Sequence, residues 1–235
     1  MSLALAHKRR VLAGGAPTSS APAAQPYTAT NALSSPANAQ KHLKLMESAL
    51  AVDLDRISQI DSREQRQLLK RDELLPKYLE YVQRYRDSGL NYPNPVLAQV
   101  LVWLFDTAQF EQGLELATFA IAQGQKLPER FDRNIQTFVG DEVIEWAEAE
   151  HKAGRSPEPY VSNLLPLVDE WKLFERIPAR YRKLLGVLAM EREEWAVAIE
   201  YFQQAETLYP EIGVKTRREA CEKALRKAEQ QNATE

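Results

Sequence analysis

Apolar side chains recur every three or four residues along most of this chain, from about Ala39 to about residue 230. That spacing puts them on one face of an α-helix, which has 3.6 residues per turn. No stretch alternates apolar and polar residues convincingly with the period of two that a half-buried strand requires. The pattern therefore predicts an all-α fold built from amphipathic helices that pack against one another.

Prolines, glycines and capping residues divide the periodic region into helices. The first is one long amphipathic helix over residues 40–71, whose apolar residues fill an arc of about 120°. Asp72 resembles the cap of a second helix that has Pro76 in its first turn, and Asn94-Pro95 can begin the third. The further helices are expected at 96–106, 110–123, 134–153, 159–174, 179–192, 194–208 and 214–230.

The first part of the chain differs in composition from the rest. Residues 11–38 contain no charged residue and one aromatic residue, and they are rich in Ala, Pro, Ser and Thr. Such a segment buries too little apolar surface to offset the entropy lost on ordering. We therefore expect a flexible basic arm and linker over 1–38, a basic amphipathic helical region over 39–90 and a body of helical hairpins over 91–235.

Charge is distributed unevenly along the sequence. Residues 1–71 hold ten Lys or Arg and five Asp or Glu, a net charge of +5, which leaves 20 basic and 28 acidic residues and a net charge of −8 for the remainder. A basic end on an acidic body suggests that one end meets a polyanion, although a chance fluctuation of surface charge is also open. On the long helix, a basic arc of about 80° lies some 140° from the apolar arc. It contains Arg56, Arg63, Arg66 and Lys70.

The last third contains a repeat-like pattern. Eight residues match positions of the tetratricopeptide unit, which is about 34 residues long. They are Leu185, Gly186, Ala189, Trp195, Ala198, Phe202, Ala205 and Pro210. Residues 101–124 fit the same frame less well and lie 85 residues earlier, which is not a multiple of 34. We therefore expect a tetratricopeptide-like unit at about 179–212, and stacked hairpins of this type usually hold partners rather than perform chemistry.

The sequence offers little for catalysis. It has no phosphate-binding loop of the form G-x-x-x-x-G-K-[ST], and its three histidines have no metal-ligand spacing. Cys221 is the single cysteine, which excludes an intramolecular disulfide, fits a reducing cytosol and favours an inert thiol in its helical setting. The longest apolar runs are far shorter than the about 20 residues that span a bilayer. We expect no cofactor, no metal ion and no membrane crossing.

Two groups of carboxylates deserve comparison with nuclease centres, which need several acids converging on metal ions. One is Asp53 with Asp55, and the other contains Asp141, Glu142, Glu145 and Glu148. Glu150 and Lys152 resemble part of a nuclease signature, but a two-residue step in a helix separates them by about 200°. We interpret the second group as the solvated face of a helix and predict no catalytic residue.

The order of several motifs resembles a known family. K-R-D-E-L-L-P-x-x-L-x-x-V covers Lys70–Val82, and V-L-V-W-L-F-D-T-A-x-F-x-x-G-L-E-L-A covers Val100–Ala117. A-x-x-x-G-x-x-L-P at Ala120–Pro128 and F-V-G-D-E-V at Phe138–Val143 follow. Together they resemble the small terminase subunit, also called the terminase endonuclease subunit, of contractile-tailed temperate phages. The resemblance extends to Ala6–Arg10 and to the A-x-x-x-x-Q-x-A hairpin around 198–205.

The resemblance implies a role in genome packaging within the host cytoplasm. A small subunit of this family would recognise double-stranded phage DNA, form an oligomer, which could be a ring, and deliver the DNA to a large subunit that carries the ATPase and the nuclease. Two alternatives stay open: an intrinsic metal-dependent endonuclease, and a helical scaffold that binds protein only. A helix-turn-helix around 40–90 is also open.

The candidate contact residues follow from the basic region and from the repeat-like hairpin. The DNA-binding candidates are Lys8, Arg9, Arg10, Lys41, Lys44, Arg56, Arg63, Arg66, Lys70 and Arg71. The partner-binding candidates are Trp195, Tyr201 and Phe202.

Overall fold

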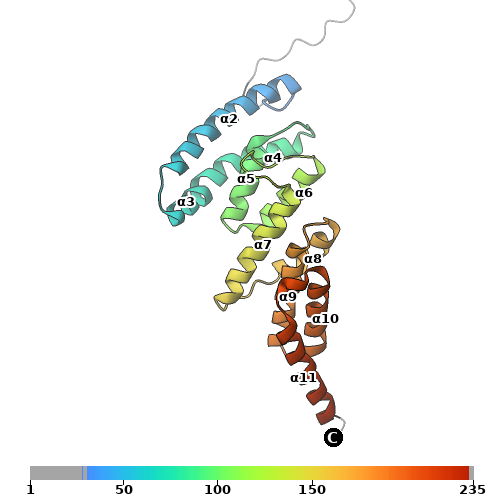
Figure 1. Ribbon diagram of the computed structural model, residues 1–235. Helices are drawn as coiled ribbons and strands as arrows, with labels where there is room; N and C mark the ends of the chain where they lie inside the picture. Colours follow the sequence, from blue (N-terminus) through green and yellow to red (C-terminus); the bar gives the residue numbers. More distant parts are fainter. Residues whose placement is uncertain (1–27, 29–30, 233–235) are drawn as a thin grey trace, which may run out of the picture. The chain divides into compact units, whose positions relative to one another are not determined.

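A computed structural model of the protein describes residue 28 and residues 31–232 (Figure 1). The described part contains helices, turns and no strand, so the all-α prediction is confirmed. The described residues up to His42 belong to one compact unit and those from Leu43 onward to a second. In the first unit, a turn in which the Ser34 N–H donates to Asn31 O (3.1 Å) precedes the first helix. The predicted domain boundaries and the flexible linker stay predictions.

The helices after residue 95 agree with the sequence analysis. All seven are present, and their ends differ from the predicted ones by at most four residues. They are α5 (Pro95–Asp106), α6 (Phe110–Ala122), α7 (Ile135–Lys152), α8 (Tyr160–Glu170), α9 (Arg176–Glu191), α10 (Trp195–Leu208) and α11 (Lys215–Asn232), with a short 3₁₀ turn η2 (Pro210–Ile212) before α11. Asn94 begins α5 as predicted, because its Oδ1 accepts a hydrogen bond from the Leu97 N–H at 3.1 Å.

The single long helix predicted over 40–71 is wrong. Helix α2 spans Pro36–Ser58 and ends there, and a new helix α3 (Arg63–Leu69) begins after Ser62. The Ser62 Oγ accepts a hydrogen bond from the Gln65 N–H at 3.3 Å and so caps α3. The chain therefore reverses direction at residues 59–62. As a result, the part of α2 from Leu43 onward lies alongside α3 and the helix that follows it (Figure 1).

The prediction that Asp72 caps a helix is also wrong. α3 continues through one wide π-helical turn, η1 (Lys70–Leu74), into α4 (Leu75–Asp87) without a break. The Leu75 N–H donates to Lys70 O, five residues back, which is the bond that defines this turn. Leu74 and Leu75 are both buried, so apolar contacts stabilise the continuous helix through the wide turn. The sequence had suggested that a new helix begins here.

Helix α5 forms the centre of the core from Leu43 onward. All ten residues from Val96 to Phe105 are buried, which a helix surrounded by other helices requires. Aromatic rings connect it to its neighbours: Trp103 packs edge-on against Tyr78 of α4 (5.7 Å between centroids), and Phe105 packs against Phe138 of α7 (5.5 Å). The described helices include none with the length and apolarity that crossing a bilayer demands.

Helices α9 and α10 form a closely packed hairpin. Gly186 of α9 faces the ring of Phe202 of α10, and a Cβ at Gly186 would lie 2.6 Å from Phe202 Cε1. The hairpin therefore needs glycine at this position because the ring leaves no room for a methyl group. The small residues Ala189, Ala198 and Ala205 are buried in the same cluster. Assignment of the hairpin to the tetratricopeptide class remains a prediction.

Candidate functional site

The structure divides the predicted basic residues into paired and unpaired ones. Lys8, Arg9 and Arg10 lie outside the described residues. Three others form ion pairs: Arg56 with Glu73 (2.7 Å), Lys70 with Asp106 (2.6 Å) and Arg71 with Asp72 (2.7 Å). The remaining four have no carboxylate partner among residues 31–232. They are Lys41, Lys44, Arg63 and Arg66.

Lys70 is not available to a polyanion. Its side chain is 13% exposed, and its Nζ donates to the Asp106 carboxylate of α5. The ammonium group therefore joins η1 to the central helix. The predicted basic arc also depended on one continuous helix, and the chain reversal at 59–62 puts Arg56 on a different helix from Arg63 and Arg66.

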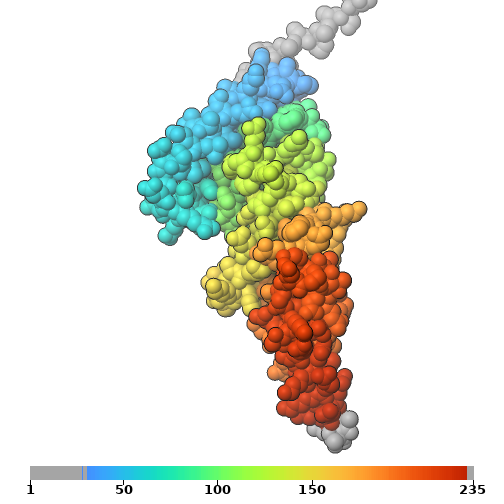
Figure 2. All heavy atoms as spheres, in the orientation of Figure 1, coloured from blue at the N-terminus to red at the C-terminus, as the bar shows by residue number. Residues whose placement is uncertain are grey.

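Arg63 and Arg66 lie three residues apart in α3 and so point in similar directions. Arg63 is the first residue of that helix, where the positive end of the helix dipole disfavours a cation. The positive charge of Arg63 therefore does not stabilise α3. The outer side of α2 and α3, blue to cyan in Figure 2, faces solvent. Lys44 and Arg63 are exposed and Arg66 is half-buried, and we refer to these three unpaired cations as the basic surface of α2 and α3.

Asp53 joins α2 to α4 in the interior. Its carboxylate accepts hydrogen bonds from Lys77 Nζ (2.6 Å) and from the Tyr78 hydroxyl (2.6 Å), and its side chain is 10% exposed. Burial alone would raise the pKa of Asp53, but the hydrogen bonds from Lys77 and Tyr78 and the charges of Lys77 and Arg56 together outweigh it, so the pKa is lowered. Asp53 is a structural acid rather than a free carboxylate.

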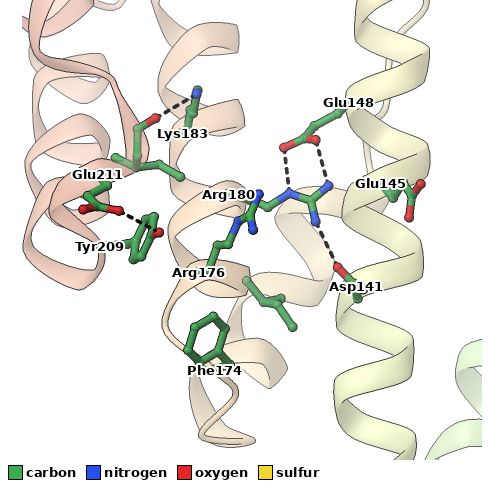
Figure 3. Close-up of a pocket in the computed structure, with 11 residues that line it drawn as sticks. Asp141, Glu145, Glu148, Phe174, Arg176, Arg180, Lys183, Tyr209 and Glu211 are labelled. Atoms are coloured by element: carbon green, nitrogen blue, oxygen red, sulfur yellow. Dashed lines mark hydrogen bonds and ion pairs between the residues drawn. The ribbon is translucent and has the colours of Figure 1, made fainter. Parts of the chain in front are cut away.

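The acids of α7 are also engaged in contacts between helices (Figure 3). Arg180 of α9 donates to Asp141 (2.9 Å) and to both oxygens of Glu148 (3.0 and 2.8 Å). Arg133 donates to Asp141 (2.7 Å) and Glu142 (2.8 Å). The guanidinium of Arg180 thus lies between the Asp141 and Glu148 carboxylates and is hydrogen-bonded to both.

Glu150, which resembles part of a nuclease signature, is similarly engaged. Glu150 accepts a hydrogen bond from Arg155 Nη2 (2.6 Å), not from Lys152. Residues 31–232 contain no group of three or more His, Cys, Asp or Glu side chains arranged to hold a metal ion. Burial raises the pKa of the Cys221 thiol, in keeping with the inert thiol expected from the sequence.

A groove of about 890 Å³ lies beside the Arg180 contact, between α7, α9 and η2 (Figure 3). Phe174, at its edge, is 63% exposed, and Arg176 has no carboxylate partner among the described residues. The Lys183 Nζ donates to Ile212 O (2.9 Å), and burial lowers the pKa of this ammonium group. The groove therefore mixes acids and cations and favours no single ligand.

The predicted partner-binding residues of α10 differ in exposure. Phe202 is fully buried against Gly186, so its ring is not available to a partner, while Trp195 and Tyr201 are half-buried. Sequence reasoning missed Val197, which is 43% exposed and lies four residues before Tyr201 on the same face of α10. Nothing in the periodic pattern distinguishes an exposed valine from a buried one.

The family model described as "Phage small terminase subunit" matches residues 47–176, more than half of the chain. The chain belongs to this family. The small terminase match includes the basic residues of α3, the Asp53 contact and all of α7, whereas helices α10 and α11 lie outside it.

Two curated small terminase relatives are similar over most of the chain. The "Probable terminase, endonuclease subunit" of Haemophilus phage HP1 is 35% identical over 165 residues, which are 70% of this chain and 59% of the HP1 protein. The "Terminase, endonuclease subunit" of Escherichia phage P2 is 29% identical over 178 residues, 75% of this chain and 72% of the P2 protein. The chain therefore spans less than two thirds of the HP1 relative. No solved structure matches it.

The lowered pKa of Asp53 predicts how stability varies with pH. Its contribution is fully present above the unfolded pKa of about 3.9 and is lost as the pH falls through the lower folded pKa. Asp53→Asn should therefore destabilise the protein at pH 7 by about 1–3 kcal/mol, because hydrogen bonds to a charged group are lost. Urea unfolding from pH 7 to pH 3 should show the difference from wild type shrinking below about pH 4. Asp55→Asn, at an exposed position, should have little effect at any pH; equal effects of both changes would contradict the role of the Asp53 contact.

Proposed function

We propose that this chain is the small subunit of a terminase that packages phage DNA in the host cytoplasm. In this proposal it binds double-stranded viral DNA, associates with copies of itself and recruits a large subunit that carries the ATPase and the nuclease. The observation that carries the proposal is the small terminase family match over residues 47–176. The arrangement of charge and exposed apolar side chains supports each part of it.

DNA binding is supported by the basic surface of α2 and α3. Arg63 and Arg66 have no carboxylate partner in the described structure, whereas Arg56 and Arg71 are neutralised by neighbouring acids. Arg63 is exposed and Arg66 is half-buried, and an unpaired arginine at the surface can neutralise a DNA phosphate. Lys44, and Lys41 on the same helix α2, add further unpaired cations. Lys8, Arg9 and Arg10 remain DNA-binding candidates on sequence grounds.

We expect the double variant Arg63→Gln/Arg66→Gln to bind duplex DNA about ten times more weakly than wild type at moderate salt. The slope of log K against log salt concentration should also become less steep by about 1.8, or 0.9 for each lost phosphate contact. Fluorescence anisotropy with a labelled duplex, from low to moderate salt, measures both quantities.

The matched control is Arg56→Gln/Arg71→Gln, which removes the same charge from residues that are already paired. It should leave the salt slope unchanged, because these two arginines already bond carboxylates and are not free to contact phosphates. It should also change stability little, because exposed ion pairs contribute little to it. Equal losses in both double variants would show that overall charge, not this surface, governs binding.

An intrinsic endonuclease is the second candidate function, favoured by the names of the HP1 and P2 relatives. The same duplex incubated with the purified chain and Mg²⁺ or Mn²⁺ tests it. Cleavage that disappears on Asp141→Asn or Glu148→Gln would show that these acids release Arg180 and bind metal ions instead.

Self-association is supported by two exposed apolar side chains on α2. Leu45 is 56% exposed and Val52 is 69% exposed, and their spacing of seven residues places them on one face of the helix. Exposed aliphatic side chains that share one helix face can be buried against another protein chain. The partner proposed for this face is a second copy of the chain.

Val52→Glu should lower the oligomeric state, because it puts a charge into the proposed contact between copies. Native mass spectrometry of the full chain measures the state directly, and circular dichroism checks the fold. Val197→Glu, on α10, is the control of equal chemistry. An unchanged distribution of oligomers in Val52→Glu would remove α2 as the contact surface.

Recruitment of a large subunit is supported by α10, where the exposed Val197 and the half-buried Tyr201 share one face. Helical hairpins commonly present such faces to protein partners. Trp195 packs partly against the hairpin core and would border this face.

We expect Val197→Asp to reduce capture of the large terminase subunit by about tenfold, because an interface core tolerates charge poorly. A pull-down with the large subunit of the same phage measures capture, and DNA affinity should stay unchanged. Leu167→Asp, an exposed apolar position on α8, is the control. If only Leu167→Asp abolished capture, the contact would lie on α8 and not on α10.

A further inference from the structure

Helix α11 is a basic helix that follows an acidic body. Residues 215–232 hold six Lys or Arg and three Glu, a net charge of +3. Residues 72–214 hold 14 Lys or Arg and 24 Asp or Glu, a net charge of −10. The chain therefore contains a second basic segment in addition to residues 1–71, and it lies outside the region that the small terminase family model matches.

Contacts with α10 determine which side of α11 faces solvent. Cys221 is buried in the apolar cluster of the α9–α10 hairpin, together with Val214 just before the helix. Arg218 donates to Glu206 of α10 (2.9 Å) and to Glu222 of its own helix (2.6 Å). Since an apolar contact and an ion pair hold the side of α11 that faces α10, the opposite side is the outer one (Figure 1).

The outer side of α11 carries four cations. Three lie two, five and six residues after Cys221, at rotations of about 200°, 140° and 240° from it, and the fourth lies six residues before it, at about 120°. All four are exposed, and none has a carboxylate partner among residues 31–232. Glu219 is an exposed acid on the same side, which leaves a net charge of +3 there. We define the four cations as the basic face of α11: Lys215, Lys223, Arg226 and Lys227.

The stability of α11 does not account for this basic face. Lys223 lies three residues before Arg226 and four before Lys227, and like charges at these spacings destabilise a helix. Lys215 is the first residue of α11, where the positive end of the helix dipole disfavours a cation. The last turn, where the dipole favours cations, contains none. A bound polyanion would neutralise these charges and remove their mutual repulsion.

We propose that the basic face of α11 binds the phosphate backbone of duplex DNA, as a second contact in addition to the basic surface of α2 and α3. The inference rests on the proposed DNA-binding function and adds a site to it. Three of the four cations are lysines, whose ammonium groups act as point charges and lack the fork that reads guanine bidentately. The contact is therefore independent of sequence, and it holds the duplex rather than selects a site on it.

The composition of α11 favours duplex DNA over a protein partner and over a single strand. None of the large hydrophobic side chains exposed in the described structure belongs to α11, whereas the core of a protein interface is rich in aromatic residues and depleted of Lys. α11 also contains no Phe, Tyr or Trp, the residues on which single-stranded bases stack. A polar, positively charged surface is typical of protein–DNA contacts.

Lysine acetylation of the full chain, with and without a DNA duplex, tests the site directly when it is followed by mass spectrometry. We expect the duplex to protect Lys223 and Lys227 from acetylation several-fold at low salt. Lys152 and Lys172 are exposed lysines of the acidic body and serve as controls. They should be modified equally with and without DNA.

The triple variant Lys223→Gln/Arg226→Gln/Lys227→Gln should bind duplex DNA about ten times more weakly, or weaker still, at moderate salt. The slope of log K against log salt concentration should become less steep by about 2.7, or 0.9 for each lost phosphate contact. The loss should be the same for a viral duplex and for an unrelated duplex of equal length, because phosphate contacts carry no sequence information. If this variant does not fold, the acetylation of the wild-type chain still decides the question.

The matched control is Arg71→Gln/Arg155→Gln/Arg192→Gln. It removes the same charge from exposed arginines that already bond carboxylates, so it should leave the salt slope unchanged. Circular dichroism checks that both triple variants keep their helices.

The outcomes separate this inference from the proposed function. Full acetylation of Lys223 and Lys227, in a sample in which DNA protects Lys44, would overturn the inference and leave the proposed function standing. Absence of any duplex binding by the wild-type chain would overturn both. Equal losses in the two triple variants would show that overall charge governs binding. Tighter binding of poly-glutamate than of a duplex of equal charge would assign the face to an acidic protein segment instead of DNA.

Discussion

The burial of helix α5 on all sides is the constraint on which the rest of the fold from Leu43 onward depends. Ten consecutive residues of this helix, from Val96 to Phe105, are buried. An α-helix with no solvated face must be enclosed by other elements, and α4, α6, α7 and η1 contact it. Its one strong ionic contact, from Asp106 to Lys70, lies at its C-terminal end, where the helix leaves the core.

The helices were largely predictable from the sequence, because each amphipathic helix displays its own period. Boundaries marked by Asn94, Gly124 or Pro210 were predicted closely, since these residues act through local backbone chemistry. The reversal after Ser58 was missed because the apolar spacing continues through Ile57 and Ile60 and no glycine or proline lies between residues 37 and 75 to mark a break. The spacing of apolar residues indicates which side of a helix is buried, but it does not indicate whether the chain reverses direction.

The candidate sites were less predictable, because they depend on contacts between residues far apart in sequence. Lys70, for example, is paired because its ammonium group donates a hydrogen bond to Asp106, which lies 36 positions later in the sequence. The acids of α7 resembled a solvated face, yet Arg180 joins two of them to α9. A further cavity, lined by Gln99 and Arg130, matches no sequence motif, since its lining residues come from three separate segments, 50–54, 91–99 and 123–130. Sequence patterns therefore located the helices. The ion pairs between distant residues, which the patterns do not contain, determine which charged side chains are available to bind a ligand.

The wide turn at Lys70–Leu74 has a consequence for the direction in which α3 faces. A π-helical turn accommodates one residue more than an α-helical turn, and one residue corresponds to a rotation of about 100° about the helix axis. Leu75 and Tyr78 pack α4 against the core and keep their positions. The rotation of α3 about its own axis depends instead on the wide turn. The side of the molecule to which Arg63 and Arg66 point is thus controlled by a single residue of chain length, a variable that insertion or deletion can change.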